Sequence, residues 1–134
     1  MILLEIPSSP EYVAIVRQAV EGIAKRMAFN SGQIEDLKLA VGEACTNAVK
    51  HGCPKSSSDN VEIRCIVVSD GLLVEIRNSI FECEYPKVPD YPDTSKEGGF
   101  GLYLIHRLMD EVDMSWEQER ATIKMLKRLN HRAA

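Results

Sequence analysis

The sequence LKLAVGEACTNAVKHG, residues 37–52, predicts a helix whose polar residues need an explanation. Its apolar side chains recur at helical spacing, as expected for a helix packed against a core. Glu43 and Asn47 are four residues apart, so they project from the same helical face. A carboxylate and a carboxamide are costly to bury unless a polar or ionic group meets them there. The rest of the chain must therefore indicate what that group is.

This helix has recognisable ends. Asn30 followed by Gln33 is a capping pair, and it predicts a helix that starts there and runs to about His51. Lys50 and His51 suit the negative end of a helix, and Gly52 can terminate it. The predicted apolar stripe consists of Ile34, Leu37, Val41, Ala44 and Ala48.

The residues before this helix predict a strand and a second helix. Residues 2–6, ILLEI, are typical of a short opening strand. Ser9 can cap a helix whose first position is Pro10, and this helix should extend to about residue 28. Its apolar residues are Val13, Val16, Val20, Ile23 and Met27.

The residues after it predict strands, a lid and one more helix. Residues 61–68 and 72–78 are two strands joined around a turn at 69–71. Residues 79–98 contain three prolines and no clear period, which is typical of a functional lid. A helix from about Leu102 to Asp110 and a hairpin of residues 114–119 and 122–129 complete the chain. The predicted fold is α+β, one domain over residues 1–134, with helices on one face of a mainly antiparallel sheet.

A second motif, EGGFGLYLIHRLMDEVD, lies at residues 97–113. Gly98, Gly99 and Gly101 precede and open the predicted helix. Glycines let a backbone approach a ligand closely, and the free N–H groups at a helix start bind phosphate. The plainer interpretation is a hinge that runs into a core helix.

The two polar residues of the first motif also have two interpretations. They can form an exposed polar strip on a half-buried helix. Alternatively, Asn47 Oδ1 coordinates a Mg²⁺ ion that carries nucleotide phosphates, since Mg²⁺ takes oxygen ligands and few protein groups. Glu43 could then accept a proton from an attacking hydroxyl. Lys50, three residues past Asn47, could reach a phosphate or remain solvated.

Together these two motifs carry a family resemblance. LKLAVGEACTNAVKHG resembles the N box of the GHKL ATPase superfamily, and GGFGLYLIHRLMDEVD resembles its second glycine box. The chain looks most like the bacterial anti-sigma factor serine kinases. That resemblance implies a two-layer Bergerat-type sandwich, ATP and Mg²⁺ as cofactors, the metal on Asn47 and a general-base role for Glu43. The implied phosphate-binding segment is Gly98, Gly99, Phe100, Gly101 and Leu102.

The chain departs from the family pattern at the adenine box. The family has an Asp-x-Gly sequence after the strand that corresponds to residues 72–78. Here Asn78 occupies the Asp position and Ile80 the glycine position. An Asn can still accept a hydrogen bond from an adenine amino group, but it lacks the charge that strengthens such a bond.

Composition restricts the possible functions. The net charge is −4 and no run of Lys and Arg forms a patch, which disfavours direct nucleic-acid binding. The start has no signal-peptide pattern and no stretch is long enough to span a bilayer, so a cytoplasmic protein without membrane contact is expected. The four cysteines, Cys45, Cys53, Cys65 and Cys83, show no CxxC spacing and are interpreted as reduced structural thiols.

The leading functional hypothesis is an ATP-dependent protein-serine kinase. The resemblance implies that it sequesters a sigma factor and phosphorylates a serine of an anti-anti-sigma protein, and it leaves a homodimer open. The principal alternative is a binding module of the same fold that switches partners without kinase activity, which the altered adenine box favours. The ATPase part of a sensor histidine kinase is a third and weaker alternative, because no helix with a phosphoacceptor His precedes the domain.

Overall fold

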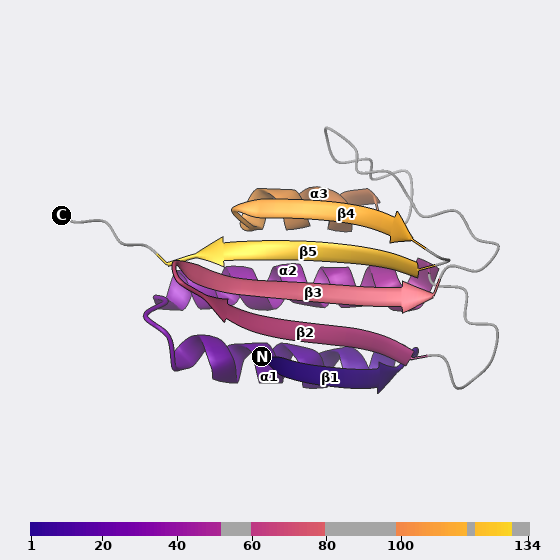
Figure 1. Ribbon diagram of the computed structural model, residues 1–134, viewed down its shortest axis with the longest axis horizontal. Helices are drawn as coiled ribbons and strands as arrows, with labels where there is room; N and C mark the ends of the chain where they lie inside the picture. The colour runs from indigo at the N-terminus through magenta and orange to yellow at the C-terminus, as the bar shows by residue number, and fades with distance from the viewer. Residues whose placement is uncertain (52–59, 80–98, 118–119, 130–134) are drawn as a thin grey trace.

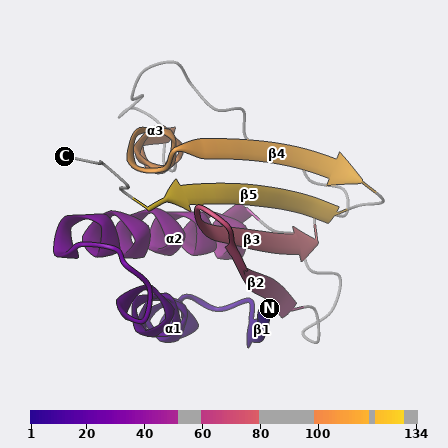
Figure 2. The same cartoon turned by 60° about the vertical axis from the view of Figure 1, so that its left-hand side comes forward.

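The structure, a computed structural model, describes residues 1–51, 60–79, 99–117 and 120–129. Over these ranges one face of a five-stranded sheet is covered by helices (Figures 1 and 2). This is the predicted α+β architecture. The elements are β1 (Ile2–Pro7), a 3-10 turn (Pro10–Tyr12), α1 (Val13–Lys25), α2 (Ser31–His51), β2 (Asn60–Val68), β3 (Gly71–Ser79), α3 (Gly99–Leu108), β4 (Glu111–Glu117) and β5 (Arg120–Arg128).

The strand order is β1-β2-β3-β5-β4, and every neighbouring pair is antiparallel. The predicted turn between β2 and β3 is confirmed, because Val68 pairs with Gly71 across Ser69 and Asp70. Gly71 is required there, since a β-carbon would lie 2.1 Å from the carbonyl oxygen of Lys127. The turn therefore packs directly on the end of β5.

The two faces of the sheet differ sharply in polarity. In β2, Val61, Ile63 and Cys65 are buried under the helices, as the period of two for a strand requires. The alternate side chains lie on the open face, where Glu62 forms ion pairs with Arg64 at 3.5 Å and Arg120 at 3.6 Å. The core therefore lies between the sheet and the helices.

The first two helices bury their predicted stripes, except that α1 ends at Lys25 rather than near residue 28 and leaves Met27 beyond its end. One predicted cap is also wrong. Asn30 and Gln33 form a reciprocal capping pair, with each side-chain oxygen accepting from the other residue's backbone N–H at 2.8 and 3.0 Å. Ser9 caps nothing, because its hydroxyl donates instead to the Glu11 carboxylate. The chain consequently makes a 3-10 turn at Pro10, and α1 starts at Val13.

The third helix starts earlier than predicted. It begins at Gly99 rather than Leu102 and ends at Leu108 rather than Asp110, so Gly101 lies in its first turn. The helix packs against α2 and crosses it at an angle, since Figure 2 shows α3 nearly end-on where α2 runs across the view. Packing against α2 outweighs the low helix propensity of glycine here. The predicted lid overlaps β3 at Ser79, and its remaining residues, 80–98, lie outside the described ranges.

No helix in the described part of the chain is long and apolar enough to cross a membrane.

Candidate functional site

The structure brings the two sequence motifs together. Gly101, in the first turn of α3, packs against the face of α2 that carries Glu43 and Asn47. A β-carbon at residue 101 would lie 2.7 Å from Glu43 Oε2 and 3.8 Å from Asn47 Nδ2. Glycine is therefore the residue that allows α3 to approach this polar face so closely.

Asn47 is buried, and its amide nitrogen, Nδ2, has no hydrogen-bond partner among the described residues. The exposed fraction of the residue is 3%. An unsatisfied buried amide of this kind costs about 1–3 kcal/mol. The interpretation of Asn47 as part of an exposed strip is therefore wrong. Glu43, one turn earlier, is half-buried and fits either interpretation.

The first turn of α3 supplies the donors that an anion needs. The first four backbone N–H groups of a helix have no partner within the helix. In α3 they belong to Gly99, Phe100, Gly101 and Leu102. The Leu102 side chain is 1% exposed and belongs to the core, so this residue can offer a ligand only its backbone. The Phe100 side chain and the whole of Gly98 lie outside the described part.

Asn78 lies at the end of β3, beside the same part of α2. It is 4% exposed, and its Nδ2 donates a hydrogen bond to the Ala48 carbonyl oxygen at 3.3 Å. An aspartate could not make this bond, because an ionised carboxylate only accepts. The residue at the predicted adenine position therefore also ties β3 to α2. Ile80, the other altered position, lies outside the described residues.

Lys50 is exposed near the end of α2, so its predicted contact with a phosphate remains a prediction.

The residues present fit a magnesium-bound nucleotide. The atom of Asn47 that lacks a partner is Nδ2, and rotation of the amide by about 180° would place Oδ1, an oxygen ligand, at the same point. The described residues contain no group of three or more His, Cys, Asp or Glu side chains that could hold a metal. Mg²⁺ takes oxygen ligands and needs few protein groups, so an Asn oxygen beside the Glu43 carboxylate is compatible with it.

Two of the four cysteines can be placed. Cys45 on α2 and Cys65 on β2 are free and buried, as predicted for structural thiols. Burial raises the pKa of Cys45 to about 12, with a smaller effect of the neighbouring Cys65. Burial likewise raises the pKa of Cys65 to about 11. Neither thiol is therefore suited to nucleophilic chemistry. Cys53 and Cys83 lie outside the described residues.

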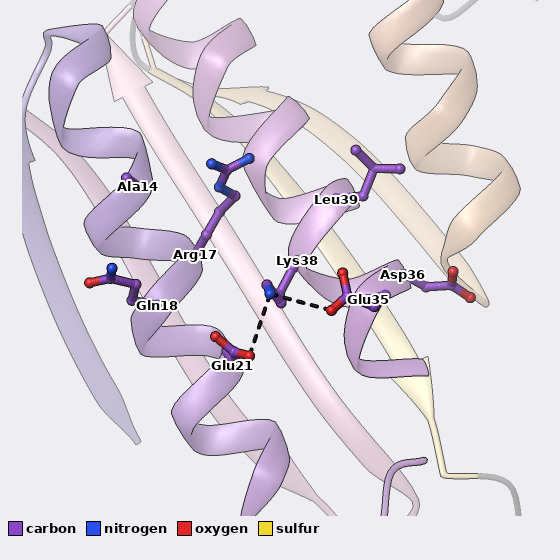
Figure 3. A pocket seen from close by; sticks show the side chains of 8 residues that line it. All are labelled: Ala14, Arg17, Gln18, Glu21, Glu35, Asp36, Lys38 and Leu39. Carbon is purple, nitrogen blue, oxygen red and sulfur yellow. Dashed lines mark hydrogen bonds and ion pairs between the residues drawn. The ribbon is translucent and has the colours of Figure 1, made fainter. Parts of the chain in front are cut away.

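A separate groove of about 530 Å³ lies between α1 and α2 (Figure 3). None of the predicted site residues lines it. Lys38 bridges Glu21 and Glu35 there, with both nitrogen–oxygen distances at 3.4 Å. Partial desolvation lowers the pKa of Lys38, but the hydrogen bonds to Glu21 and Glu35 outweigh this effect, so the pKa lies above its usual value. This groove is a helix surface with ion pairs, and it is separate from the site formed by Glu43, Asn47 and Gly101.

Sequence patterns missed one buried charged residue, Lys127 on β5. Its Nζ atom donates to the Leu108 carbonyl oxygen at 2.7 Å and lies 3.3 Å from Asp36 Oδ2. The alternation of β5 could have identified it, since Lys127 follows Ala121, Ile123 and Met125 on the buried face.

The chain resembles known ATPase and kinase domains over nearly its whole length. The model of the histidine kinase-like ATPase domain matches residues 6–127. The serine-protein kinase RsbW of Bacillus subtilis is 39% identical, over 95% of this chain and 84% of that protein. The serine-protein kinase RsbW of a Listeria monocytogenes strain is 34% identical, over 98% of this chain and 88% of that protein.

Solved structures share the fold. A Mycobacterium tuberculosis protein with RsbU and RsbW domains aligns with a TM-score of 0.66 at 16% identity, over 96% of this chain and 33% of that one. A histidine kinase domain from Erythrobacter litoralis aligns with a TM-score of 0.55 at 21% identity, over 92% of this chain and 62% of that one. The match over residues 6–127 and the identity to the RsbW proteins show that this chain belongs to the histidine kinase-like ATPase family, in its serine-protein kinase RsbW branch.

Proposed function

We propose that this chain is an ATP-dependent protein-serine kinase that acts as an anti-sigma factor. The observation that carries the proposal is the close packing of Gly101 on Glu43 beside the unsatisfied amide of Asn47. A domain that only binds other proteins has no evident need for a buried amide without a partner next to a helix start. The kinase activity named for the RsbW relatives supports the same conclusion.

Each residue has a separate role in the proposal. Asn47 would hold Mg²⁺, and the N–H groups at the start of α3 would bind phosphate oxygens. The metal, when bound, neutralises charge that develops on the phosphates during transfer. Glu43 accepts the proton of the attacking serine hydroxyl, so that the oxygen can bond to phosphorus as the bond to the leaving ADP breaks.

The proposed partners are proteins. The substrate is a serine of a small anti-anti-sigma protein, and the sequestered partner is a sigma factor, as the family resemblance implies. The acidic net charge of −4 gives this chain no electrostatic reason to bind nucleic acid itself.

One observation favours the alternative of a partner-switching module without kinase activity. The Asn78 Nδ2 donates to the Ala48 carbonyl, so only Oδ1 could accept a bond from an adenine amino group, and this oxygen lacks the charge of the family's Asp. If the adenine site is lost, partner binding by the same surfaces remains, while nucleotide binding does not.

The test is titration of the purified chain with Mg-ATP and Mg-ADP, followed by a transfer assay. We expect saturable heat in calorimetry, a higher melting temperature with nucleotide, and phosphate on a serine of the cognate anti-anti-sigma protein. Partner binding without any nucleotide heat at millimolar concentration would favour the module. Binding of nucleotide without phosphate transfer to the partner would support the proposed ATP site and contradict the proposed kinase activity.

A further inference from the structure

We infer that Lys127 is a positioning residue for the nucleotide site. It holds the C-terminal end of α3 and thereby fixes the position of the first turn of α3, which belongs to the site. This inference rests on the proposed function, since it concerns the geometry of the same site. It assigns a role to a buried lysine that contacts none of the predicted site residues.

Lys127 is a charged residue in an apolar layer. It lies on the helix-covered face of β5, after Ala121, Ile123 and Met125, and only 9% of it is exposed. A lysine is rarely buried to this degree unless its ammonium group is paired. Here the ammonium group has two partners that come from two different helices.

The first partner is the end of α3. The Leu108 carbonyl oxygen accepts a hydrogen bond from Lys127 Nζ at 2.7 Å. The last carbonyls of a helix have no partner within the helix, and the negative end of the dipole favours a cation there. Lys127 thus supplies both a hydrogen-bond donor for this carbonyl and a positive charge at the negative end of the helix dipole.

The second partner is the beginning of α2. Asp36 Oδ2 lies 3.3 Å from Lys127 Nζ. The Asp36 side chain is 42% exposed and that of Lys127 only 11%, so the lysine is the buried member of the pair. Figure 3 shows Asp36 pointing from α2 toward α3. One ammonium group therefore links α2, α3 and β5.

This link and the proposed site lie at matching distances along the two helices. Asp36 and Glu43 are seven residues apart on α2, and Gly101 and Leu108 are seven residues apart on α3. Seven residues of helix correspond to about 10 Å. The Lys127 link joins Asp36 to the end of α3, and Gly101 near the start of α3 packs on Glu43, so these two contacts lie at opposite ends of α3.

The hydrogen bonds of Lys127 fix the axial position of α3, which apolar packing alone would leave adjustable. Leu102 and Ile105 of α3, and Met109 directly after it, attach this helix to the core through buried apolar side chains. Such contacts are not directional, so they resist separation of the helices more than sliding along the axis. The hydrogen bonds of Lys127 depend on angle and distance, and they set the axial position of α3.

The site needs that axial position. Gly101 packs against the Glu43 carboxylate and near Asn47, so a shift of α3 along its axis would move the N–H groups of its first turn relative to both side chains. Displacements of about 1 Å at reacting groups can cost about 10²-fold in rate. Lys127 therefore acts on the phosphate site through the position of α3, without touching it.

The experiment compares Lys127→Met and Lys127→Arg in the full chain, with Mg-ADP as the probe. We expect Lys127→Met to weaken Mg-ADP binding by about tenfold, comparable to the loss of a second-shell partner at a metal site. Lys127→Arg keeps donors for both partners and should recover most of the affinity. Asp36→Asn keeps the bond to Leu108 and should fall between wild type and Lys127→Met.

Two matched controls separate positioning from a general loss of stability. Lys124→Met removes an exposed lysine from the same strand, and Val20→Ala weakens the core at α1. Both should bind Mg-ADP like wild type at temperatures where each variant is folded. If Lys127→Met does not fold, Asp36→Asn carries the same test.

Hydrogen exchange without nucleotide gives an independent measurement. Lys127→Met should speed amide exchange at residues 103–105, near Gly101, as well as at residues 106–108. Faster exchange confined to residues 106–108, or wild-type affinity in Lys127→Met, would overturn the inference and leave the lysine as a helix cap. If wild type binds no Mg-ADP, the proposed function fails, while the exchange data still decide whether Lys127 positions α3.

Discussion

Gly101 lies against the Glu43 carboxylate so closely that a β-carbon at residue 101 would lie 2.7 Å from Oε2. The obstructing atom is the end of a flexible side chain rather than backbone. An added methyl group would therefore move the carboxylate more readily than it would move α3.

This relationship predicts the effect of Gly101→Ala. The protein should fold with a free energy of unfolding within about 1 kcal/mol of wild type, because better helix propensity offsets the crowding. Serine phosphorylation should fall by about tenfold or more as Glu43 is displaced. The matched control is Gly22→Ala, where nothing lies within 4 Å, and it should leave transfer unchanged. A Gly101→Ala variant with the wild-type rate would show that this contact is not part of the kinase site.

Replacement of Glu43 should separate chemistry from binding. In Glu43→Gln we expect nearly unchanged Mg-ADP affinity and serine phosphorylation slower by about 10²–10⁴-fold, because the amide cannot accept the hydroxyl proton. Single-turnover transfer to the anti-anti-sigma protein measures this. Glu35→Gln, a change on the same helix within the α1–α2 groove, is the control. Equal rates for Glu43→Gln and wild type would exclude the base assignment.

Replacement of Asn47 should have opposite effects on stability and binding. Asn47→Ala removes a buried amide without a partner, so the free domain should lose little stability or gain some. Mg-nucleotide affinity should fall by at least about tenfold. Calorimetry and melting curves with and without Mg-ADP test both effects. Thr46→Ala, at the exposed neighbouring position, should change neither. Early melting of Asn47→Ala with unaltered affinity would mean that Asn47 is only structural.

Asn78→Asp tests the altered adenine position. A carboxylate cannot donate to the Ala48 carbonyl, and it would be buried beside that oxygen, so we expect a loss of about 1–3 kcal/mol in stability. Affinity for adenine nucleotides should nevertheless rise, because a charged acceptor strengthens the bond to the adenine amino group. Thermal melts and competition between Mg-ADP and Mg-GDP measure the two effects. Unchanged selectivity between the two bases would place adenine recognition elsewhere.

The buried thiols predict a dependence on pH. The pKa values of Cys45 and Cys65 are raised from 9.0 to about 12 and about 11, so both groups stay protonated in the folded state well above pH 9. The unfolded chain loses these protons earlier, so their contribution to stability is complete below pH 9.0. It declines as the pH rises toward 11 and 12. Iodoacetamide at pH 8 should leave both residues unmodified until denaturant is added, as peptide mass mapping would show.

The elements of the fold follow from local patterns, but their arrangement depends on long-range contacts. Apolar periods and turn residues predict the helices, the hairpins and the coverage of one sheet face. They do not predict that β5 pairs with β3, because this depends on residues about 45 positions apart, such as Arg77 and Thr122. The earlier start of α3 likewise depends on packing against α2, which offsets the low helix propensity of glycine.

The site likewise combines residues that local patterns predict with contacts between distant residues that they do not predict. Glu43 and Asn47 could be predicted as a pair because they lie on one helix. The resemblance of the two sequence motifs to those of one family predicted that Gly101 would lie near them. The bond between Asn78 and Ala48 and the link between Asp36 and Lys127 join separate elements, the latter across 91 positions. Strand alternation indicates that Lys127 is buried but not which partners it meets.

The position of β5 has a consequence for synthesis of the protein on the ribosome. This strand is made after the other four strands of the described sheet, yet it lies between β3 and β4. Until residues 120–128 have emerged, β3 has an unpaired edge that exposes the backbone of residues 71–79 to other chains. Premature termination before residue 120 would therefore release a fragment with an open hydrophobic strand, and such fragments aggregate.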